Sequence, residues 1–539
     1  MENFSLLVGF GTSLLVIFAI GKLFQARRNA RRLPLPPGPK GLPLVGNLLD
    51  LPPPGTFAAY HWVKHKDLYG PISCVSVGSD TIVLLNDAQA AFDLLEKQSL
   101  LTSGRPELEF LNIYVAILLT PARVGNQNST GALQYNDTLR THRKHFARII
   151  GTRATAGQFD KLQEAEVAHF LLHVLDDPDN LEAHIKKEVG SVILQMVYGY
   201  GTENFKEDPL LTLIARVMED FAQSAMPGAH LVDILPILHY VPSWFPGTAW
   251  KQEAKRMAKD LINSIEVPYA FVERQVAQGN NRLSFLSRLF ELDKDIPEDK
   301  MINKWVAASI FQGGSDTTVA VLFAFYLAMT LFPDVQKKAQ DEIDRVVGSE
   351  RLPTLDDRDN LPYIDALVKE IIRWWPVGPM GLPHRNPNEM TYRGYRIPKM
   401  SVIYANIWGF THDPAVYKNP MEFWPERFLE GQDREPEFDP RKLSFGFGRR
   451  ICPGKVLAEN SLFLSIAQSL AVFDVAKKVV DGKVIEPKVE PKPGVISHQA
   501  HYETSIKPRS PHHEELIRSL EQKFPWQESD ARALKRMKA

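Results

Sequence analysis

The sequence predicts one large, mainly helical domain with a smaller β portion. Amphipathic helical patterns cover most of residues 154–279, and the apolar pattern of residues 297–332 predicts one helix of about 35 residues, roughly 50 Å long. Alternating apolar and polar residues predict a hairpin over 72–85 and a pair of strands around Gly394 over 390–406. No linker rich in Gly, Ser or Pro follows residue 60, so the 539 residues, 44% of them hydrophobic, are expected to share one core.

The composition excludes some classes of protein. The formal net charge is -1 and the sequence pI is near 7.0, so no basic excess indicates nucleic-acid binding, and we expect none. Only two cysteines occur, Cys74 and Cys452. Cys74 lies in a strand-like run and is expected to fill space in the core. Without a disulfide framework, the folded body is expected to lie in a reducing, cytosolic environment.

Residues 1–32 are predicted to be a membrane anchor with a basic flank. Residues 3–21 form a 19-residue run without a charge, about the length that a helix needs to cross a hydrocarbon core of roughly 30 Å. Only Glu2 precedes this run, which predicts a luminal N-terminus and a cytosolic body. The basic residues that follow it are Lys22, Arg27, Arg28, Arg31 and Arg32. A cleaved signal peptide is the alternative, but the positive charge lies on the wrong side of the apolar run.

Three segments are predicted after the anchor. Residues 33–41 are rich in proline and predict a stiff hinge. Residues 42–508 form the body, and residues 509–539 are predicted to be a charged surface tail. Within the body, the apolar residues of 226–246 either belong to the core or dip into the bilayer.

Residues 445–454 place a thiol on a glycine-rich turn, with two arginines just before it. The glycines at 446, 448 and 454 let the backbone approach a flat, bulky group and direct N–H groups at the sulfur of Cys452. Heme is the cofactor that uses these features together, through an axial thiolate on iron, a close backbone and a guanidinium for a propionate. A buried, inert cysteine beside a glycine turn is the alternative interpretation.

The spacing of five residues in this loop resembles the heme-binding loop of the cytochrome P-450 monooxygenases. They are Phe445, Gly448, Arg450, Cys452 and Gly454. The resemblance implies the cytochrome P-450 fold, mainly α with a smaller β portion, as a single large heme domain. It also implies heme b (iron protoporphyrin) as the cofactor, with Cys452 as the ligand of the iron and the other four residues in the heme-binding loop.

The helix predicted over 297–332 carries a second match. Gly313 and Gly314 are poor helix formers, and a run of short polar side chains follows them in apolar surroundings. Paired glycines open a groove for a small ligand, and an acid beside an alcohol there can pass protons. The stretch resembles the family's oxygen-activation motif, which implies that Asp316 relays protons and that Thr317 hydrogen-bonds the dioxygen. A glycine kink with a polar patch facing solvent is the alternative.

Glu370 and Arg373 lie three residues apart on a helix predicted over 361–374. Such a pair is usually a surface feature worth well under about 1 kcal/mol. Here it resembles the family's Glu-x-x-Arg motif, and residues 425–428 resemble the segment that completes it. The resemblance implies a buried triad of Glu370, Arg373 and Arg427, which braces the cysteine loop and has a structural role.

Two further residues are expected to hold the heme propionates. A basic helix predicted over 136–146 carries Arg143 where the family has an arginine, but Leu139 stands where the family usually has a tryptophan. A solvated basic face, or a surface for an acidic redox partner, is the alternative for these charges. His384 occupies the position that binds the second propionate in some members, and a histidine that is merely packed is the alternative there.

The resemblance implies insertion of one atom of dioxygen into a lipophilic small organic substrate. The chain has no Gly-x-Gly-x-x-Gly loop after a strand, so the electrons are expected from a membrane-bound NADPH-dependent reductase, at the endoplasmic reticulum. Residues 405–408 and 412–414 resemble fungal members of secondary metabolism, such as the O-methylsterigmatocystin oxidoreductase group. The alternatives are a heme-thiolate isomerase or dehydratase, against which Asp316 and Thr317 argue, and a heme-binding sensor without turnover.

Overall fold

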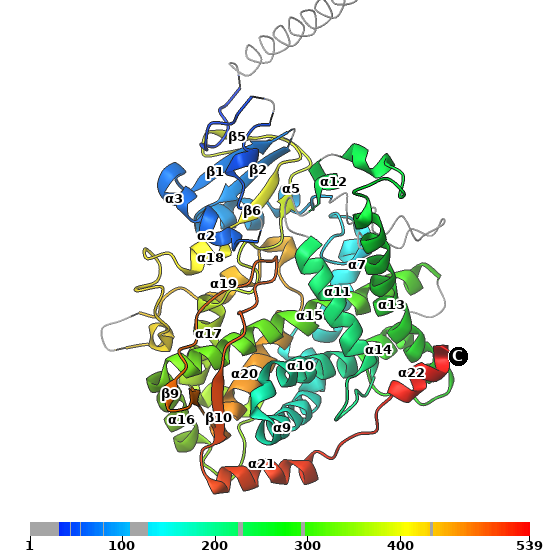
Figure 1. The fold of residues 1–539 in the computed structure, drawn as a ribbon, viewed down its shortest axis with the longest axis vertical. Helices are drawn as coiled ribbons and strands as arrows, with labels where there is room; N and C mark the ends of the chain where they lie inside the picture. The colour runs from blue at the N-terminus through cyan, green and yellow to red at the C-terminus, as the bar shows by residue number, and fades with distance from the viewer. Residues whose placement is uncertain are drawn as a thin grey trace, which may run out of the picture.

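The structure is a computed structural model. It describes residues 32–43, 45–53, 55–78, 80–107, 128–224, 230–234, 236–292, 297–431 and 435–538. The predicted membrane span over residues 3–21 lies outside the described residues. The mainly helical class with a small sheet portion is confirmed (Figure 1).

Helices make up most of the described chain. The longer ones are α7 (Asp137–Ile150), α9 (Asp160–Asp176), α10 (Leu181–Tyr198), α11 (Pro209–Ser224), α13 (Ala249–Ala277), α14 (Phe285–Leu292), α15 (Pro297–Leu331), α16 (Pro333–Val346), α17 (Pro362–Trp374), α20 (Lys455–Val472), α21 (Pro511–Lys523) and α22 (Ala531–Lys538). The short ones are α2 (Ala58–Trp62), α3 (Lys64–Tyr69), α4 (Ala88–Ala91), α5 (Ser99–Thr102), α8 (Arg153–Ala156), α12 (Leu231–Ile234), α18 (Ile407–Thr411) and α19 (Arg441–Ser444).

The strands are short. They are β1 (Ile72–Val77), β2 (Asp80–Leu85), β3 (His384–Arg385), β4 (Met390–Tyr392), β5 (Tyr395–Ile397), β6 (Val402–Ala405), β7 (Phe473–Lys477), β8 (Val479–Val480), β9 (Lys483–Val484) and β10 (Thr504–Pro508). Strands β4 and β5 form the pair that the alternation around Gly394 predicts.

A four-stranded sheet in the order β1-β2-β6-β3 joins two distant parts of the chain. Strands β1 and β2 form the predicted antiparallel hairpin, in which Ile72 lies opposite Leu85. Strand β6 runs parallel to β2 and places Ala405 opposite Leu85. Figure 1 shows this sheet at the end of the molecule where the described chain begins, with the helices beyond it.

Helix α15 is the central helix of the larger, helical part, where it packs against α10, α11, α13 and α20. It matches the predicted helix to within one residue and continues through Gly313 and Gly314 without a break. Trp305 and Phe311 are buried on it, as its apolar sequence requires. Among the described residues, only Lys300–Leu331 is long and apolar enough to cross a membrane, and 72% of its most apolar window is buried inside the protein.

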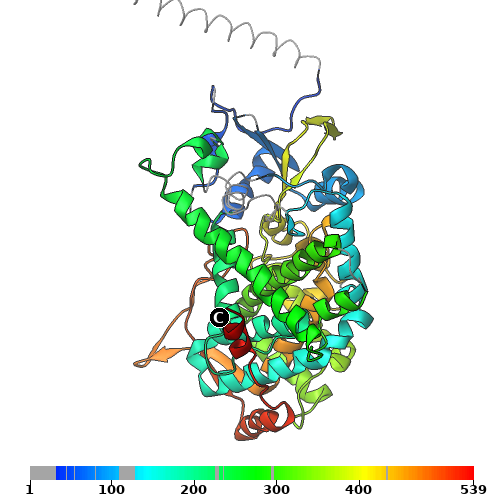
Figure 2. The ribbon, with the colours of Figure 1, turned by 90° about the vertical axis from the view of Figure 1, so that its right-hand side faces the viewer.

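The segment predicted as a charged surface tail contains two helices, α21 and α22. Helix α21 packs along α9 and buries Ile517 and Leu520, and both views show the red C-terminal helices against the helical part (Figures 1 and 2). Pro511 lies in the first turn of α21, where its missing N–H removes no helical hydrogen bond. Ser510 caps this helix by accepting from the N–H of His513.

Candidate active site

A cavity of about 480 Å³ lies between α15 and the 445–454 loop. Seven of the residues predicted for the site line it: Arg143, Thr317, His384, Phe445, Arg450, Cys452 and Gly454. Asp316 and Gly448 do not line it, and neither do Glu370, Arg373 and Arg427. The cysteine loop and the glycine-bearing helix therefore both border this cavity.

The loop holds the Cys452 thiol toward the cavity through its backbone. The N–H of Cys452 donates to the carbonyl of Phe445 at 2.8 Å. The side chain is solvent-accessible although the loop lies deep in the protein, because its accessible surface faces the cavity. Burial raises the pKa of this thiol, whereas the Gly454 N–H and the nearby Arg143 and Lys455 lower it. A metal at the sulfur would favour the thiolate further.

The glycine at 448 is required for packing outside the cavity. Its φ is +53°, and a Cβ there would lie 2.5 Å from the carbonyl oxygen of Leu95. Gly454, in contrast, lines the cavity, and a Cβ on it would lie 4.0 Å from the Cys452 sulfur. Gly448 therefore lets the loop pack against the carbonyl of Leu95, and the missing side chain at Gly454 leaves space in the cavity beside the sulfur.

Four cationic or potentially cationic side chains line the cavity: Arg105, Arg143, His384 and Arg450. They donate to backbone carbonyls: Arg143 to Ile451 at 2.9 Å, Arg450 to Ser103 at 2.8 Å, and Arg105 to Gly131 at 2.8 Å and Pro383 at 2.6 Å. Within the described part of the chain, none of the four forms an ion pair with a carboxylate. Burial lowers the pKa of all three arginines. A cluster of cations without a counter-ion is suited to an anionic ligand.

Arg105, which was not predicted from the sequence, also belongs to this cluster. It is 6% exposed, and the charge of Arg450 adds to burial in lowering its pKa. The only signal in the sequence was its position between Gly104 and Pro106, which is equally typical of a surface turn. Three arginines, rather than two, can therefore face an anion in this cavity.

His384 lines the cavity as a neutral side chain. Its Nδ1 lies 2.9 Å from the carbonyl oxygen of Thr102, and because a carbonyl can only accept, Nδ1 carries the hydrogen. Burial, with Arg105 and Arg450 nearby, lowers the pKa of His384 well below its usual value. The other nitrogen, Nε2, is then an acceptor, so His384 would need a second proton before it could donate to a carboxylate. An anion beside it would favour that proton.

The two glycines of α15 that line the cavity differ in the space beside them. A Cβ on Gly313 would meet nothing within 4 Å, whereas one on Gly314 would lie 2.6 Å from the Cδ1 atom of Ile193 on α10. Thr317 lines the cavity, and its hydroxyl donates to the carbonyl of Gly313 at 2.9 Å. Asp316 is directed elsewhere, toward His498, whose Nε2 lies 3.0 Å from its Oδ2. No motif in the sequence indicates His498.

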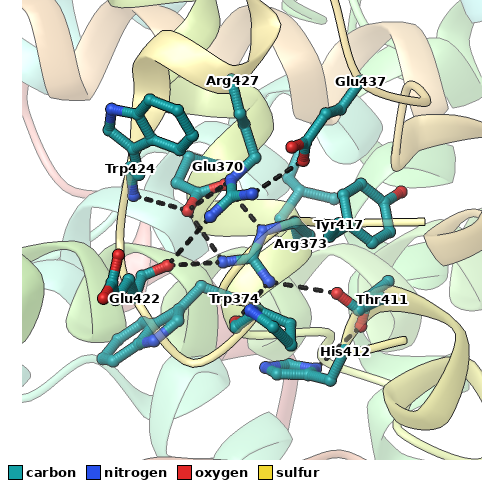
Figure 3. A network of polar contacts seen from close by, with 12 residues as sticks. Glu370, Arg373, Trp374, Thr411, His412, Tyr417, Glu422, Trp424, Arg427 and Glu437 are labelled. Atoms are coloured by element: carbon teal, nitrogen blue, oxygen red, sulfur yellow. Dashed lines mark hydrogen bonds and ion pairs between the residues drawn. The ribbon is translucent and has the colours of Figure 1, made fainter. Parts of the chain in front are cut away.

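The brace residues meet as the resemblance implies (Figure 3). Glu370 accepts from Nε of Arg373 at 2.7 Å and lies 3.2 Å from Nε of Arg427. All three side chains are fully buried. Arg427 also pairs with Glu437 at 2.7 Å, a fourth member that the sequence analysis did not identify. Two guanidiniums and two carboxylates thus balance in charge.

A buried carboxyl group, Glu188 of α10, also lines the cavity. Ser465 donates to one of its oxygens, and Oε2 has no hydrogen-bond partner among the described residues. Burial raises the pKa of Glu188 to about 8 from its ordinary 4.5. The folded protein therefore holds a proton here at pH values where the unfolded chain has lost it.

Glu188→Gln should stabilise the protein at neutral pH and reduce its pH dependence. Between pH 4.5 and about 8 the unfolded state binds fewer protons at this group, so stability falls as pH rises, and it changes little from this cause outside that range. A gain on the order of 1–3 kcal/mol is expected at pH 7, and almost none near pH 4. Thermal unfolding of both proteins at several pH values would measure it; an equal midpoint at pH 7 would contradict the shift.

The residues present fit a heme. The described residues contain no group of three or more His, Cys, Asp or Glu side chains that could hold a metal ion. The Cys452 thiol that faces the cavity suits an iron held in a macrocycle, for which the protein would supply this thiolate. The uncompensated arginines fit the propionates of that macrocycle, and the open face at Gly313 leaves room on the side opposite the thiol.

Comparison with known proteins agrees with this geometry. The family model described as Cytochrome P450 matches residues 36–505. The chain is 44% identical over 508 residues to cytochrome P450 monooxygenase ppsD of Aspergillus oryzae, and the matched residues cover 94% of each chain. It is 44% identical over 508 residues to cytochrome P450 monooxygenase claR of Ampulloclitocybe clavipes, covering 94% of this chain and 91% of that protein. It is 40% identical over 529 residues to the O-methylsterigmatocystin oxidoreductase of Aspergillus flavus, covering 98% and 97%. The chain therefore belongs to the cytochrome P450 family and is a monooxygenase of the fungal type.

Proposed function

We propose that this monooxygenase inserts one atom of dioxygen into a lipophilic small molecule of fungal secondary metabolism, with electrons from an NADPH-dependent reductase. The observation that carries the proposal is the meeting of the Cys452 thiol, three arginines and Thr317 around one cavity. A relative named O-methylsterigmatocystin oxidoreductase supports a secondary metabolite as the substrate.

Cys452 would hold heme b as its thiolate, and Phe445 and Gly454 would border the macrocycle. Arg105, Arg143 and Arg450 would bind the propionates, with His384 accepting a proton beside them. When bound, the heme supplies the oxygen-activating chemistry. Leu139 lines the cavity and offers no hydrogen bond, so the arginines would do without the tryptophan that the family usually has at this position.

The wall of the cavity supports a lipophilic substrate. Beyond the polar groups already described, apolar side chains from several elements line it: Val217, Phe221, Leu261, Ile310, Val377 and Ile496. Burial of such a surface against a hydrocarbon skeleton is favourable by roughly 25 cal/mol per Å². The substrate would thus be held mainly by apolar contact, with its reacting carbon toward Thr317.

We place the body on the cytosolic face of the endoplasmic reticulum membrane, anchored through residues 3–21. Apolar side chains are exposed on α12 and the segment after it: Leu231 is 68% exposed, Ile237 74% and Trp244 81%. In Figure 1 this region lies at the same end of the molecule as the start of the described chain. Both features support contact of this end with the bilayer.

The reduced carbon monoxide difference spectrum of the full chain, expressed in membranes, tests the proposal. A strongly red-shifted Soret band is expected, since a thiolate donates more electron density to iron than an imidazole does. NADPH and dioxygen should then be consumed when a fungal reductase and a lipophilic substrate are added. A band at the position of histidine-ligated heme would refute the assignment of Cys452, and a thiolate band without NADPH consumption would favour a sensor or an isomerase.

Thr317→Ala should retain heme but divert reducing equivalents to hydrogen peroxide. The hydroxyl that faces the cavity is lost, and with it the hydrogen bond that we assign to the dioxygen. The ratio of product to NADPH should fall several-fold, and peroxide should rise to match. Thr330→Ala is the matched control, because Thr330 makes the same bond to the carbonyl four residues earlier, at 2.8 Å, and does not line the cavity. Unchanged coupling in Thr317→Ala would refute its role.

A further inference from the structure

His498 meets the acid of the oxygen-side helix from the far end of the chain. Its Nε2 lies 3.0 Å from Oδ2 of Asp316, which is 182 positions away in sequence. The exposed fraction of the side chain is 23% for His498 and 19% for Asp316. The pair therefore lies at the boundary between solvent and the protein interior.

The backbone around His498 is fixed from three sides. The N–H of Ser497 donates to the carbonyl of Val377 at 2.8 Å, and the indole N–H of Trp375 donates to the carbonyl of Ser497 at 2.9 Å. The carbonyl of His498 accepts from the N–H of Lys492 at 2.7 Å. The imidazole is thus presented to Asp316 by a segment that is itself tied to the end of α17.

The His498–Asp316 pair lies between solvent and the residues that line the cavity. Thr317, the neighbour of Asp316 on α15, lines the cavity, whereas Asp316 does not. In the segment that carries His498, Val495 and Ile496 line the cavity. A proton on His498 is therefore one hydrogen bond from a carboxylate whose neighbour faces the site of the proposed reaction.

We propose that His498 is a positioning residue for proton delivery, which holds Asp316 and passes it protons taken from solvent. The inference rests on the proposed function, because the reaction consumes two protons and two electrons for each dioxygen: one oxygen atom enters the substrate and the other leaves as water. In the step assigned here, the Nε2–H bond of the imidazole breaks and an O–H bond forms on Asp316, while Nδ1 accepts a proton from a hydronium ion in solvent. Loss of the Nδ1 proton to water and return of a proton at Nε2 then reset the imidazole.

Two other charged groups lie near His498. Glu182 of α10 faces it, since Lys492 and His498 both lower the pKa of Glu182, and Lys186 pairs with that same carboxylate at 2.7 Å. Lys492 lies on the same segment as His498, so the side chains around the pair carry charges of both signs.

The test compares His498→Gln with His501→Gln in the heme-loaded full chain. Gln can still donate to Asp316 but carries no titratable proton. His501 is a nearby exposed histidine that pairs with Glu503 at 3.9 Å. We expect His498→Gln to lower NADPH-driven product formation by on the order of 10-fold, to flatten its pH profile and to raise its solvent isotope effect. His501→Gln should match the unmodified protein in all three.

Two further measurements separate proton delivery from a structural role. Hydrogen peroxide, supplied in place of NADPH and dioxygen, brings both protons with it, so His498→Gln should react with it at the unmodified rate. The double variant His498→Gln with Asp316→Asn should be no slower than Asp316→Asn alone, because both changes interrupt the same path. In addition, the changes in thermal unfolding midpoint of His498→Gln and Asp316→Asn should not add up to that of the double variant, because the two side chains are in contact.

The inference is overturned if His498→Gln behaves like His501→Gln with NADPH, or if its rate falls equally with peroxide. Failure of the proposed function is distinguishable, because it would show in the unmodified protein as the lack of a red-shifted band or of NADPH-driven product. If His498→Gln does not retain heme, His498→Asn is put through the same pair of assays and judged by the same outcomes.

Discussion

Replacing Cys452 by Ser should abolish the red-shifted Soret band of the reduced carbon monoxide complex and bring NADPH-driven oxygenation to background. A serine hydroxyl stays protonated at neutral pH and donates little electron density to iron. The fold should survive, because the loop is held by its backbone, including the 2.8 Å bond between the Cys452 N–H and the Phe445 carbonyl. The difference spectrum, heme content and thermal midpoint of the variant measure these outcomes together.

Cys74→Ser is the matched control for this prediction. Cys74 is buried in β1, and its thiol donates to the carbonyl of Pro36 at 3.0 Å, which a serine hydroxyl can also do. Burial raises the pKa of this thiol to about 11, so it is protonated and unsuited to bind iron. The red-shifted band should remain in Cys74→Ser. A band that persisted in Cys452→Ser, or that vanished with Cys74, would contradict the assignment.

Features of the fold that depend on local pattern were predictable from the sequence. The period of apolar residues gave α15 to within one residue, and alternation about a turn gave the β1–β2 hairpin. The cysteine loop was recognisable because its chemistry is concentrated in ten consecutive residues. In each case the residues that determine the feature are close together in the chain, so the pattern can be recognised in the sequence.

Features that depend on contacts between distant segments were not predictable. His498 reaches Asp316 across 182 positions, and Arg105 reaches Pro383 across 278. Nothing in the residues around His498 or Arg105 distinguishes them from exposed charges, because their roles arise from the backbone that carries them into place. The C-terminal helix α21 also depends on a distant segment, because it buries Ile517 and Leu520 against α9. The local composition, which is rich in charged residues, does not indicate this contact.

Glu370→Gln should destabilise the protein by about 3–5 kcal/mol and cause loss of heme. Both oxygens of Glu370 are in use: Oε1 accepts from the Trp424 N–H at 2.6 Å and from Arg373, and Oε2 contacts Arg373 and Arg427 (Figure 3). The amide would leave two fully buried guanidiniums with a single carboxylate, that of Glu437. Uncompensated positive charge in a dry interior is costly.

Loss of heme is expected because α17 contacts the residues that lead into the cysteine loop. Ser444, the residue before the cysteine loop, directs its hydroxyl at the carbonyl of Ile372 on α17 at 3.4 Å. α17 also packs against α19, which leads into the loop. When the brace loosens, α17 can no longer hold the start of the loop that presents the thiol. A structural role of this kind predicts that heme content and thermal midpoint fall together, whereas the spectrum of any heme that remains keeps its thiolate character.

An exposed pair with the same spacing provides the control for Glu370→Gln. Glu291 lies three residues after Arg288 on α14, at 2.9 Å, with side chains 58% and 47% exposed. Solvent screens that pair, so Glu291→Gln should change stability by no more than about 1 kcal/mol and leave heme content unaltered. If both variants unfolded at the same temperature, the burial of the Glu370 brace would contribute nothing, and the cysteine loop would have to be held by its own turns alone. A drop confined to Glu370→Gln would instead show that one carboxylate, 82 residues before the thiol in sequence, sets whether the heme is retained.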